Sequence, residues 1–449
     1  MDVELRFTDK EITAWGGMGL MKRLLDHLRF DHVLEKAQLP QPGSNRGYRP
    51  EQLIVQFMVS VWCGANRFEH SEVTRHDPVL KRLFGFVRMA NFKAIMRLFR
   101  KFSQPDNDRM AQTLYGELFH QLHVDPLTLD LDSTVMTRYG KQEGAVRGYN
   151  PSKRGRPSHH PLMAFVADTR MVANCWLRPG NTSSANNVNA FLDSTLTHLA
   201  TKRVALVRAD SGFSGTGFLD HLEQKNLSYS VALKLTAPLQ RALVDAQGWW
   251  TLDDGIELVS IDYQAQSWSH PRRVIGIRQH IAKREQARGK TLSLFADDQR
   301  WEEYRFSALV TDLTLPTQEV WRLYRGRADC ENRIKELKYD FAADSFCLTD
   351  FWATEACLTV VMIAYNLMSL FRQVALKNSV IQSKGKEVQH TLNTLRLKLF
   401  AKAGYMGVEG RKSVLKLAIA MRQRTWFEGI WNHSKSFDLP VCFSPAFTP

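Results

Sequence analysis

The sequence predicts an α/β protein in which strands lie between two helical regions, and three observations support this class. Apolar residues recur at helical spacing over most of residues 1–125. After Pro126 the apolar period changes to two, and strands alternate with helices up to residue 237. Residues 238–304 fall into short alternating segments. We therefore expect a sheet flanked by helices and a β-rich insertion, followed by core residues 305–375 and a helical, basic region at 376–449.

The first 125 residues are expected to be helical and are a candidate for DNA binding. Pro50 occupies a plausible first helical position. In the segment 91–103, Lys93, Arg97 and Arg100 share one helical face opposite apolar residues. A basic amphipathic helix can enter a DNA groove. A helix that packs its apolar side and solvates its charges has the same pattern, so both interpretations stay open.

Charge and cysteine content narrow the class of protein. The chain has 449 residues, and 60 Lys and Arg against 46 Asp and Glu give a net charge of +14, which suits a polyanionic partner. Its six cysteines form no CxxC pair, which argues against a zinc ribbon or a disulfide framework and fits a reducing cytosol. The charged N-terminus predicts no signal peptide, and the apolar run Cys357–Leu370 predicts a buried helix that is too short to span a bilayer.

Two acidic sites lie on the predicted strands, a pair of aspartates and a single one. Asp130 and Asp132 are two apart in an alternating segment, so they share a strand face. Carboxylates on an apolar strand are costly unless a cation neutralises them, although an edge strand with a wet face has the same pattern. Asp210 ends a second buried strand and precedes Ser211 and Gly212. Strand ends of this kind are where α/β sheets place active sites.

A basic loop lies between these acids. Residues 138–160 contain six Lys or Arg and one acid, and they include Arg154 and Arg156 in a segment broken by Gly and Pro. A basic loop beside paired carboxylates suits a phosphodiester substrate, because the loop attracts the phosphate backbone.

A third acid lies on the predicted helix Trp321–Phe341. Read at about 100° per residue, Tyr324, Arg327, Glu331 and Lys338 fall within roughly 60° of one another, and Lys335 joins that face. A carboxylate flanked by cations suits a phosphate beside a metal ion. A solvated helix with i,i+4 ion pairs is the competing interpretation.

Together the three acids predict a metal site. Asp132, Asp210 and Glu331 offer hard oxygen ligands that suit two Mg²⁺ ions, or Mn²⁺ in their place. Two such ions clamp the attacking and leaving oxygens of a phosphoryl displacement. The sequence therefore favours metal-dependent attack on a phosphodiester by water or by a DNA 3′-hydroxyl.

Three motifs resemble the DDE transposases of bacterial insertion sequences: DLDST at 130–134, VRADSGF at 207–213, and the helix at 321–341. The helix matches the Tyr-x2-Arg-x3-Glu-x6-Lys signature as Tyr324, Arg327, Glu331 and Lys338. The segments GYNPSKRGRPSHHPL and RPGNTSS are similar to the insertion-sequence family numbered thirteen-eighty. The similarity spans roughly residues 45–430.

The resemblance implies a catalytic core of the RNase H-like type, with a mixed five-stranded sheet at 126–237 and 305–375 and a β-rich insertion at 238–304. It also implies Asp132, Asp210 and Glu331 as metal ligands, with Asp130 as the alternative first ligand. Tyr324, Arg327, Lys335 and Lys338, with Arg154 and Arg156, would contact DNA.

The same resemblance implies a cut-and-paste transposase that acts on terminal inverted repeats of double-stranded DNA and on target DNA. It implies a homodimer when the two ends are joined, in the bacterial cytoplasm at the nucleoid. A hairpin intermediate is a hypothesis, with Trp249, Trp250 or Trp268 taking the flipped base. A DNA-binding regulator that kept the fold without catalysis is the alternative, and a shorter junction nuclease fits less well.

Overall fold

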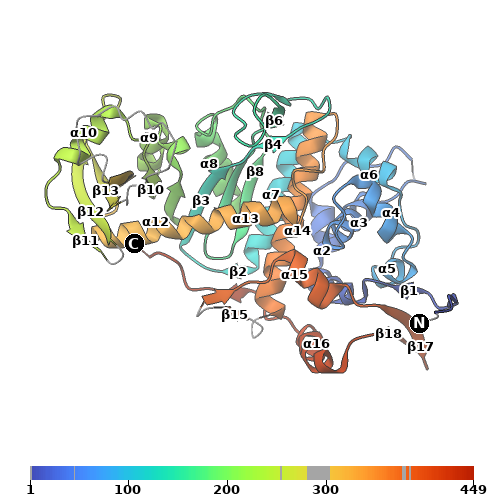
Figure 1. Cartoon of the computed structure of the whole chain (residues 1–449). Coiled ribbons are helices and arrows are strands. Elements are labelled where there is room, and N and C mark those ends of the chain that lie inside the picture. The colour runs from blue at the N-terminus through green and yellow to red at the C-terminus, as the bar shows by residue number, and fades with distance from the viewer. Residues whose placement is uncertain are drawn as a thin grey trace.

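The computed structural model describes residues 3–44, 46–252, 255–280, 304–376, 381–383 and 386–448. The molecule is elongated: a β-rich end and a cluster of helices lie on either side of the middle of a large sheet (Figure 1). The mixed α/β class is confirmed.

The N-terminal part is a cluster of short helices, as predicted. Helix α3 begins at Pro50, whose missing N–H has no partner to lose in the first helical turn. In α6, Lys93, Arg97 and Arg100 are exposed and the apolar side is buried. The helices here are α1 (Gly19–His27), α2 (Phe30–Lys36), α3 (Pro50–Trp62), α4 (Ser71–Arg75), α5 (Pro78–Leu83), α6 (Phe92–Phe99) and α7 (Gln104–His120).

A nine-stranded mixed sheet forms the centre, in the order β11-β12-β13-β14-β10-β9-β3-β7-β8. β3 pairs in parallel with β9 and antiparallel with β7, and β9 pairs in parallel with β10. The strands are β3 (Leu127–Ser133), β7 (Leu162–Val166), β8 (Met171–Trp176), β9 (Val204–Ala209), β10 (Ser228–Ala232), β11 (Trp250–Thr251), β12 (Ile256–Tyr263), β13 (Arg272–His280) and β14 (Tyr304–Thr311).

The sheet is larger than the five-stranded core that the resemblance implies, because strands of the predicted β-rich insertion join it. β14 hydrogen-bonds on both edges, and its Val310 lies opposite Val231 of β10 and Val274 of β13. The strands of the predicted insertion therefore extend the main sheet. A further strand predicted at 291–297 lies outside the described residues, and the domain boundaries stay predictions.

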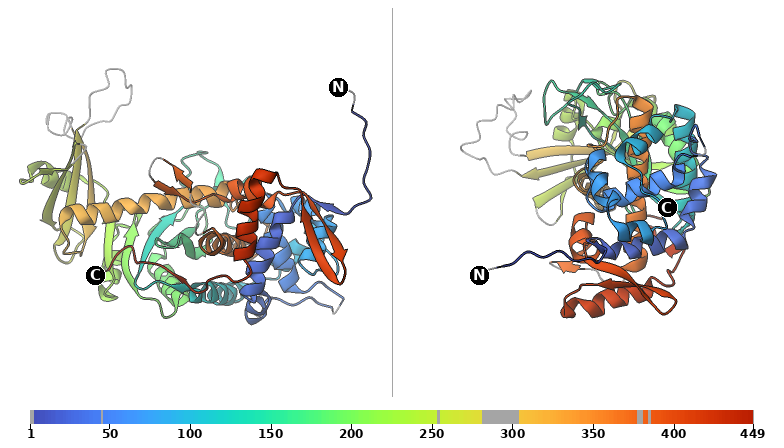
Figure 2. Two further views of the ribbon diagram at one scale, coloured as in Figure 1. Left: turned by 90° about the horizontal axis from the view of Figure 1, so that it is seen from below. Right: turned by 90° about the vertical axis from the view of Figure 1, so that its right-hand side faces the viewer.

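Helices cover the sheet and connect it to the N-terminal cluster. The predicted helix at 321–341 is a run of three segments that crosses the molecule (Figures 1 and 2). These are α12 (Thr317–Arg325), a 3₁₀ turn (Gly326–Ala328) and α13 (Asp329–Tyr339). The other helices of this part are α8 (Val188–Leu199), α9 (Thr216–Gln224), α10 (Ala237–Asp245) and α14 (Phe351–Ala375).

Helix α14 forms the centre of the hydrophobic core. By length and composition alone it could cross a membrane, but its whole apolar window is buried inside the protein. It contacts β8, α7 and α3, so it joins the sheet to the N-terminal helices. The prediction of a buried helix here is confirmed, and the helix is longer than the apolar run that predicted it.

The C-terminal region is mixed rather than helical, contrary to the prediction. A hairpin turns at Gly410, which has a positive φ of 61°. β1 (Ile12–Thr13) pairs with that hairpin, and β2 (Leu122–His123) pairs with the last strand, so the C-terminal region packs against two segments of the N-terminal part. The elements are β15 (Ile381–Ser383), β16 (Lys386–Val388), α15 (Leu392–Leu395), β17 (Gly404–Glu409), β18 (Lys412–Leu417), α16 (Met421–His433) and β19 (Val441–Cys442).

Candidate active site

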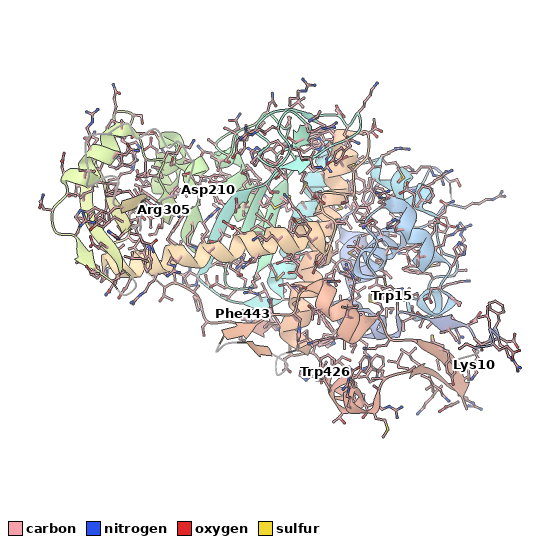
Figure 3. All side chains as sticks on the ribbon, viewed as in Figure 1. Lys10, Trp15, Asp210, Arg305, Trp426 and Phe443 are labelled. Atoms are coloured by element: carbon pink, nitrogen blue, oxygen red, sulfur yellow. The ribbon has the colours of Figure 1, made fainter. Side chains whose placement is uncertain are left out.

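Asp132 and Asp210 lie side by side at the ends of two neighbouring parallel strands. β3 and β9 are in register with Leu131 opposite Ala209, so the next residue of each chain is an aspartate. Asp210 directly follows β9, an interior strand of the sheet (Figure 3), and its carboxylate accepts from the Gly212 N–H at 2.9 Å. Burial raises the pKa of Asp132, and the charge of Asp210 raises it further.

Asp130, the alternative first ligand, is held in a different arrangement. It is fully buried, and the Arg208 guanidinium binds both of its oxygens, at 2.6 and 2.9 Å. Arg208 also donates to the Leu323 carbonyl and so ties α12 to the sheet. Gly326 is close to this guanidinium, since a Cβ there would lie 2.7 Å from Arg208 Nη1. Asp130 therefore has its own cation and a structural role.

Arg327 occupies the 3₁₀ turn that faces the acid pair. Its Nη2 lies 3.0 Å from Asp132 Oδ2 and donates to the Leu131 carbonyl at 3.3 Å. Burial lowers the pKa of Arg327, but Asp132 and the other negative groups around it together raise the pKa above its ordinary value, so the guanidinium stays charged. Tyr324, one turn earlier, is also near the acids, and burial raises the pKa of its phenol.

The remaining residues of the predicted helical signature take different positions. Lys338 is half-buried and donates to the Val135 carbonyl at 2.9 Å, and burial lowers its pKa. Glu331 and Lys335 are exposed, and within the described part of the chain neither side chain has a hydrogen bond or ion pair. Among the residues that the structure describes, no three acidic, histidine or cysteine side chains are grouped closely enough to hold a metal ion. The structure thus brings Asp132 and Asp210 together and leaves Glu331 in solvent.

The acid pair nevertheless fits a divalent cation. Two carboxylates beside one another, one of them buried, carry a charge that must be neutralised. Arg327 neutralises Asp132 in this structure. Carboxylate oxygens are the ligands that Mg²⁺ prefers, and Glu331 lies next to Cys330, whose thiol contacts Asp132. The residues present could hold a cation on Asp132 and Asp210, with Glu331 able to reach it only through a side-chain rearrangement.

The basic loop lies at the top of the sheet, held by β4 (Met136–Thr137), β5 (Val146–Arg147) and β6 (Pro157–His159) (Figure 1). Arg154 and Arg156 are exposed there. Arg138 is not, because it is buried and donates to His159 Nδ1 at 3.0 Å and to the Asp344 carbonyl. One of the six loop cations is therefore structural.

The sequence reasoning missed His160, Ser133 and Ser184. His160 Nε2 is 3.1 Å from Ser133 Oγ, which is 2.9 Å from Ser184 Oγ. His159 and His160 are adjacent in the sequence, but their side chains have different partners. The only signal in the sequence was that all three contributing segments belong to the motifs that carry the resemblance.

The three tryptophans of the β-rich part differ in exposure. Trp268 is buried against Tyr263, and Trp249 packs on Phe306 beneath the Arg278 guanidinium. Trp250, on the edge strand β11, is 38% exposed. Of these three side chains, that of Trp250 is the most exposed.

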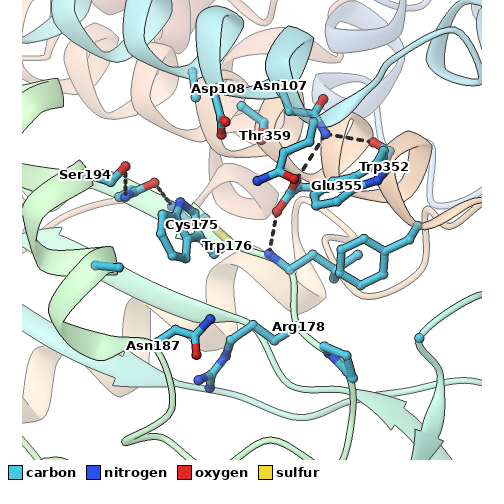
Figure 4. A pocket seen from close by; sticks show the side chains of 18 of the residues that line it. Asn107, Asp108, Cys175, Trp176, Arg178, Asn187, Ser194, Trp352, Glu355 and Thr359 are labelled. Carbon is cyan, nitrogen blue, oxygen red and sulfur yellow. Dashed lines mark hydrogen bonds between the residues drawn. The ribbon is translucent and has the colours of Figure 1, made fainter.

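A cavity of about 810 Å³ lies beside β8, between α7, α8 and α14 (Figure 4). Glu355 reaches into it and accepts from the Leu177 N–H at 3.0 Å and from Asn107 Nδ2 at 3.1 Å. Burial raises the pKa of Glu355 to about 7.

The comparison with family models gives the class of the protein. The model of the transposase DDE domain, group 1, matches residues 1–435. The chain therefore belongs to this family of DDE transposases, whose members generally cleave DNA and transfer its strands with divalent metal ions. Its broad function is DNA transposition.

No curated protein matches the chain. Among solved structures, the chain is similar to the cryo-EM structure of a piggyBac transposase synaptic complex with hairpin DNA. The identity is 12%, the TM-score is 0.41, and the match covers 87% of this chain and 81% of that one.

Proposed function

We propose that this protein is a cut-and-paste transposase that cleaves the terminal inverted repeats of its own insertion sequence and joins the ends to target DNA. Asp132, Asp210 and Glu331 would hold two Mg²⁺ ions, or Mn²⁺ in their place. The observation that carries the proposal is the pair of carboxylates at the ends of adjacent parallel strands, beneath a helix that carries a third. When bound, the ions activate the attacking oxygen and stabilise the leaving one.

We propose an RNase H-like core and membership of the insertion-sequence family numbered thirteen-eighty. The strand order β8-β7-β3-β9-β10, with antiparallel pairing at β8-β7-β3 and parallel pairing at β3-β9-β10, supports the core assignment. The segments at 146–162 and 178–184 support the family assignment.

The protein's own residues would bind and orient the DNA. Arg154 and Arg156 would attract the backbone from an exposed loop. Lys335 would contact a phosphate from the exposed face of α13, and Tyr324, Arg327 and Lys338 would hold the strand end close to the acid pair. In this structure Arg327 Nη2 is paired with Asp132, so a phosphate at that nitrogen would compete with the carboxylate.

The working form is proposed to be a homodimer on two DNA ends, in the bacterial cytoplasm. The net charge of +14 supports the polyanionic partner. A hairpin intermediate would require an aromatic side chain to take the flipped base, and Trp250 is the exposed candidate among the three.

Incubation of the purified protein with a duplex that carries the element's end, with and without Mg²⁺, tests the proposal. Cleavage at the end that requires the ion, and that Glu331→Gln abolishes, supports a transposase. Specific binding without cleavage under any divalent ion would favour the alternative, a regulator with the same fold.

A further inference from the structure

Two sequence segments with no role so far meet beside the acid pair. His160 comes from the segment before β7, and Thr182 comes from the loop after β8. His160 Nδ1 lies 2.8 Å from the Thr182 carbonyl oxygen. The backbone N–H of His160 donates to the Arg178 carbonyl at 2.9 Å, and Arg178 Nε donates back to the His160 carbonyl at 3.0 Å. The two segments thus hold one another at a fixed distance.

The hydrogen-bond partners of His160 decide which of its two ring nitrogens carries the proton. A carbonyl oxygen only accepts, so His160 Nδ1 must carry the proton that bonds Thr182. In the neutral ring Nε2 is then an acceptor, and the Ser133 hydroxyl donates a hydrogen bond to it, with an Nε2–Oγ distance of 3.1 Å. Ser133 Oγ in turn accepts from Ser184 Oγ at 2.9 Å. Burial lowers the pKa of His160, which keeps the ring neutral.

The two serines that carry these hydroxyls lie beside the acid pair, and backbone N–H groups make the bonds to the carboxylates. At one end, the Ser133 N–H donates to Asp132 Oδ1 at 2.7 Å. At the other, Ser184 Oγ packs on Gly212, whose N–H holds Asp210 Oδ1. A Cβ on Gly212 would lie 2.9 Å from Ser184 Oγ and 3.0 Å from Asp210 Oδ1, so the hydroxyl and the carboxylate share a narrow space. The hydrogen-bonded side chains of His160, Ser133 and Ser184, here called the brace, therefore lie across the ends of β3 and β9.

We propose that His160 is a positioning residue of the acid pair, acting through the Ser133 and Ser184 hydroxyls. It fixes the direction of both hydroxyls and thereby the spacing of Asp132 and Asp210. This inference rests on the proposed function of the pair as a cation site. Outer partners that orient ligands in this way typically contribute 10- to 100-fold to metal affinity or activity.

Two substitutions of His160 separate the acceptor from the donor. His160→Gln can place an amide oxygen near the position of Nε2 and keep the acceptor for Ser133. His160→Asn can keep the donor to Thr182 but leaves Ser133 without an acceptor. We expect the Asn variant, and Ser184→Ala, to lower kcat for end cleavage by about 10- to 100-fold with KM for DNA unchanged. The Gln variant should stay within about threefold of the wild type, because the acceptor is retained.

His159→Asn is the matched control. His159 is the adjacent buried imidazole, but its nitrogens contact Arg138 and the Glu143 carbonyl rather than the brace. The His159→Asn variant should have a lower melting temperature than the wild type and the same kcat. An Asn variant at 160 with wild-type kcat, or a control that lowers kcat equally, would overturn the inference.

Mn²⁺ binding provides a readout that does not depend on catalysis. Titration of Mn²⁺ into each variant on an end duplex should show affinity about tenfold weaker for His160→Asn and unchanged for His159→Asn. If the wild type bound Mn²⁺ but did not cleave, the proposed transposase activity would fail while this comparison still decided the role of His160. Equal Mn²⁺ affinity in both variants would reject that role.

Discussion

The guanidinium of Arg327 lies 3.0 Å from Asp132 Oδ2, where the proposed chemistry requires a divalent cation. An arginine and a metal ion would compete for that carboxylate, because each supplies the positive charge that the buried group needs. A phosphate offers Arg327 an alternative partner of the same sign. DNA binding and metal binding should therefore be coupled, because a phosphate that draws Arg327 away frees Asp132 for the ion.

Arg327→Ala tests that coupling. Without DNA, the variant should bind Mn²⁺ about tenfold more tightly than the wild type, because the competing cation is gone; tenfold corresponds to about 1.4 kcal/mol. Its affinity for the end duplex should fall. Calorimetry or electron paramagnetic resonance measures the first quantity and fluorescence anisotropy the second. Arg322→Ala, an exposed change in α12, is the control, and unchanged Mn²⁺ affinity in Arg327→Ala would contradict the coupling.

Glu331 and Glu336 offer a comparison within one helix. Glu331 is exposed, so Glu331→Gln should change the unfolding free energy by less than about 0.5 kcal/mol. It should nevertheless lower metal-dependent cleavage by more than about 100-fold if it is a ligand. Glu336 is ion-paired with Arg372 and accepts from the Leu392 N–H. Glu336→Gln should cost about 3–5 kcal/mol, because it leaves Arg372 buried without its charge partner. Urea unfolding and a cleavage assay on both variants measure the contrast, and a destabilised Glu331→Gln or an inactive but stable Glu336→Gln would reverse the assignment.

How much of this site the sequence could predict depends on the range of the interactions. The period-two pattern was enough to place Asp130 and Asp132 on one strand face and to end a second strand at Asp210, and the structure pairs these two strands. It could not choose between the two aspartates, because the choice is made by Arg208 on another strand.

The helical wheel placed Tyr324 and Arg327 on the face near the acids, yet it assumed an unbroken α-helix. The 3₁₀ turn at Gly326–Ala328 changes the angle per residue there, and Glu331 is exposed. The continuity of the sheet through β14 and the hairpin β17–β18 depend on pairings between distant segments. Local periodicity carries no information on such pairings.

The basic loop should govern the salt dependence of DNA binding. Arg154 and Arg156 are exposed, and each phosphate contact contributes about one to the slope of log K against log salt. Replacing both with Ala should reduce that slope by about two. Arg411→Ala with Lys412→Ala is the matched control, because these cations lie at the β17–β18 turn at the other end of the molecule (Figure 1). Anisotropy titrations from 50 to 300 mM salt measure the slope, and an equal reduction in both double variants would reject a specific role for the loop.

Glu355 should make stability depend on pH. Its folded pKa is about 7 against an ordinary value of 4.5, because burial opposes the charge and no cation offsets it. For a raised pKa, the stabilisation is complete below the unfolded value and is lost as pH rises through the folded value. This group should therefore lower the unfolding free energy by up to about 3 kcal/mol between pH 5 and pH 8.

Glu355→Gln removes that titration. The unfolding free energy of the variant should therefore increase relative to that of the wild type as pH rises. Asn107 already donates to this side chain and to the Trp352 carbonyl, so the amide can be accommodated with modest change (Figure 4). Glu331→Gln removes the same charge from an exposed position and should show no such shift. Urea unfolding at pH 5, 6.5 and 8 measures all three proteins. A constant difference between Glu355→Gln and the wild type would mean that the carboxyl ionises at its ordinary pKa, and that water enters the cavity deeply enough to solvate it.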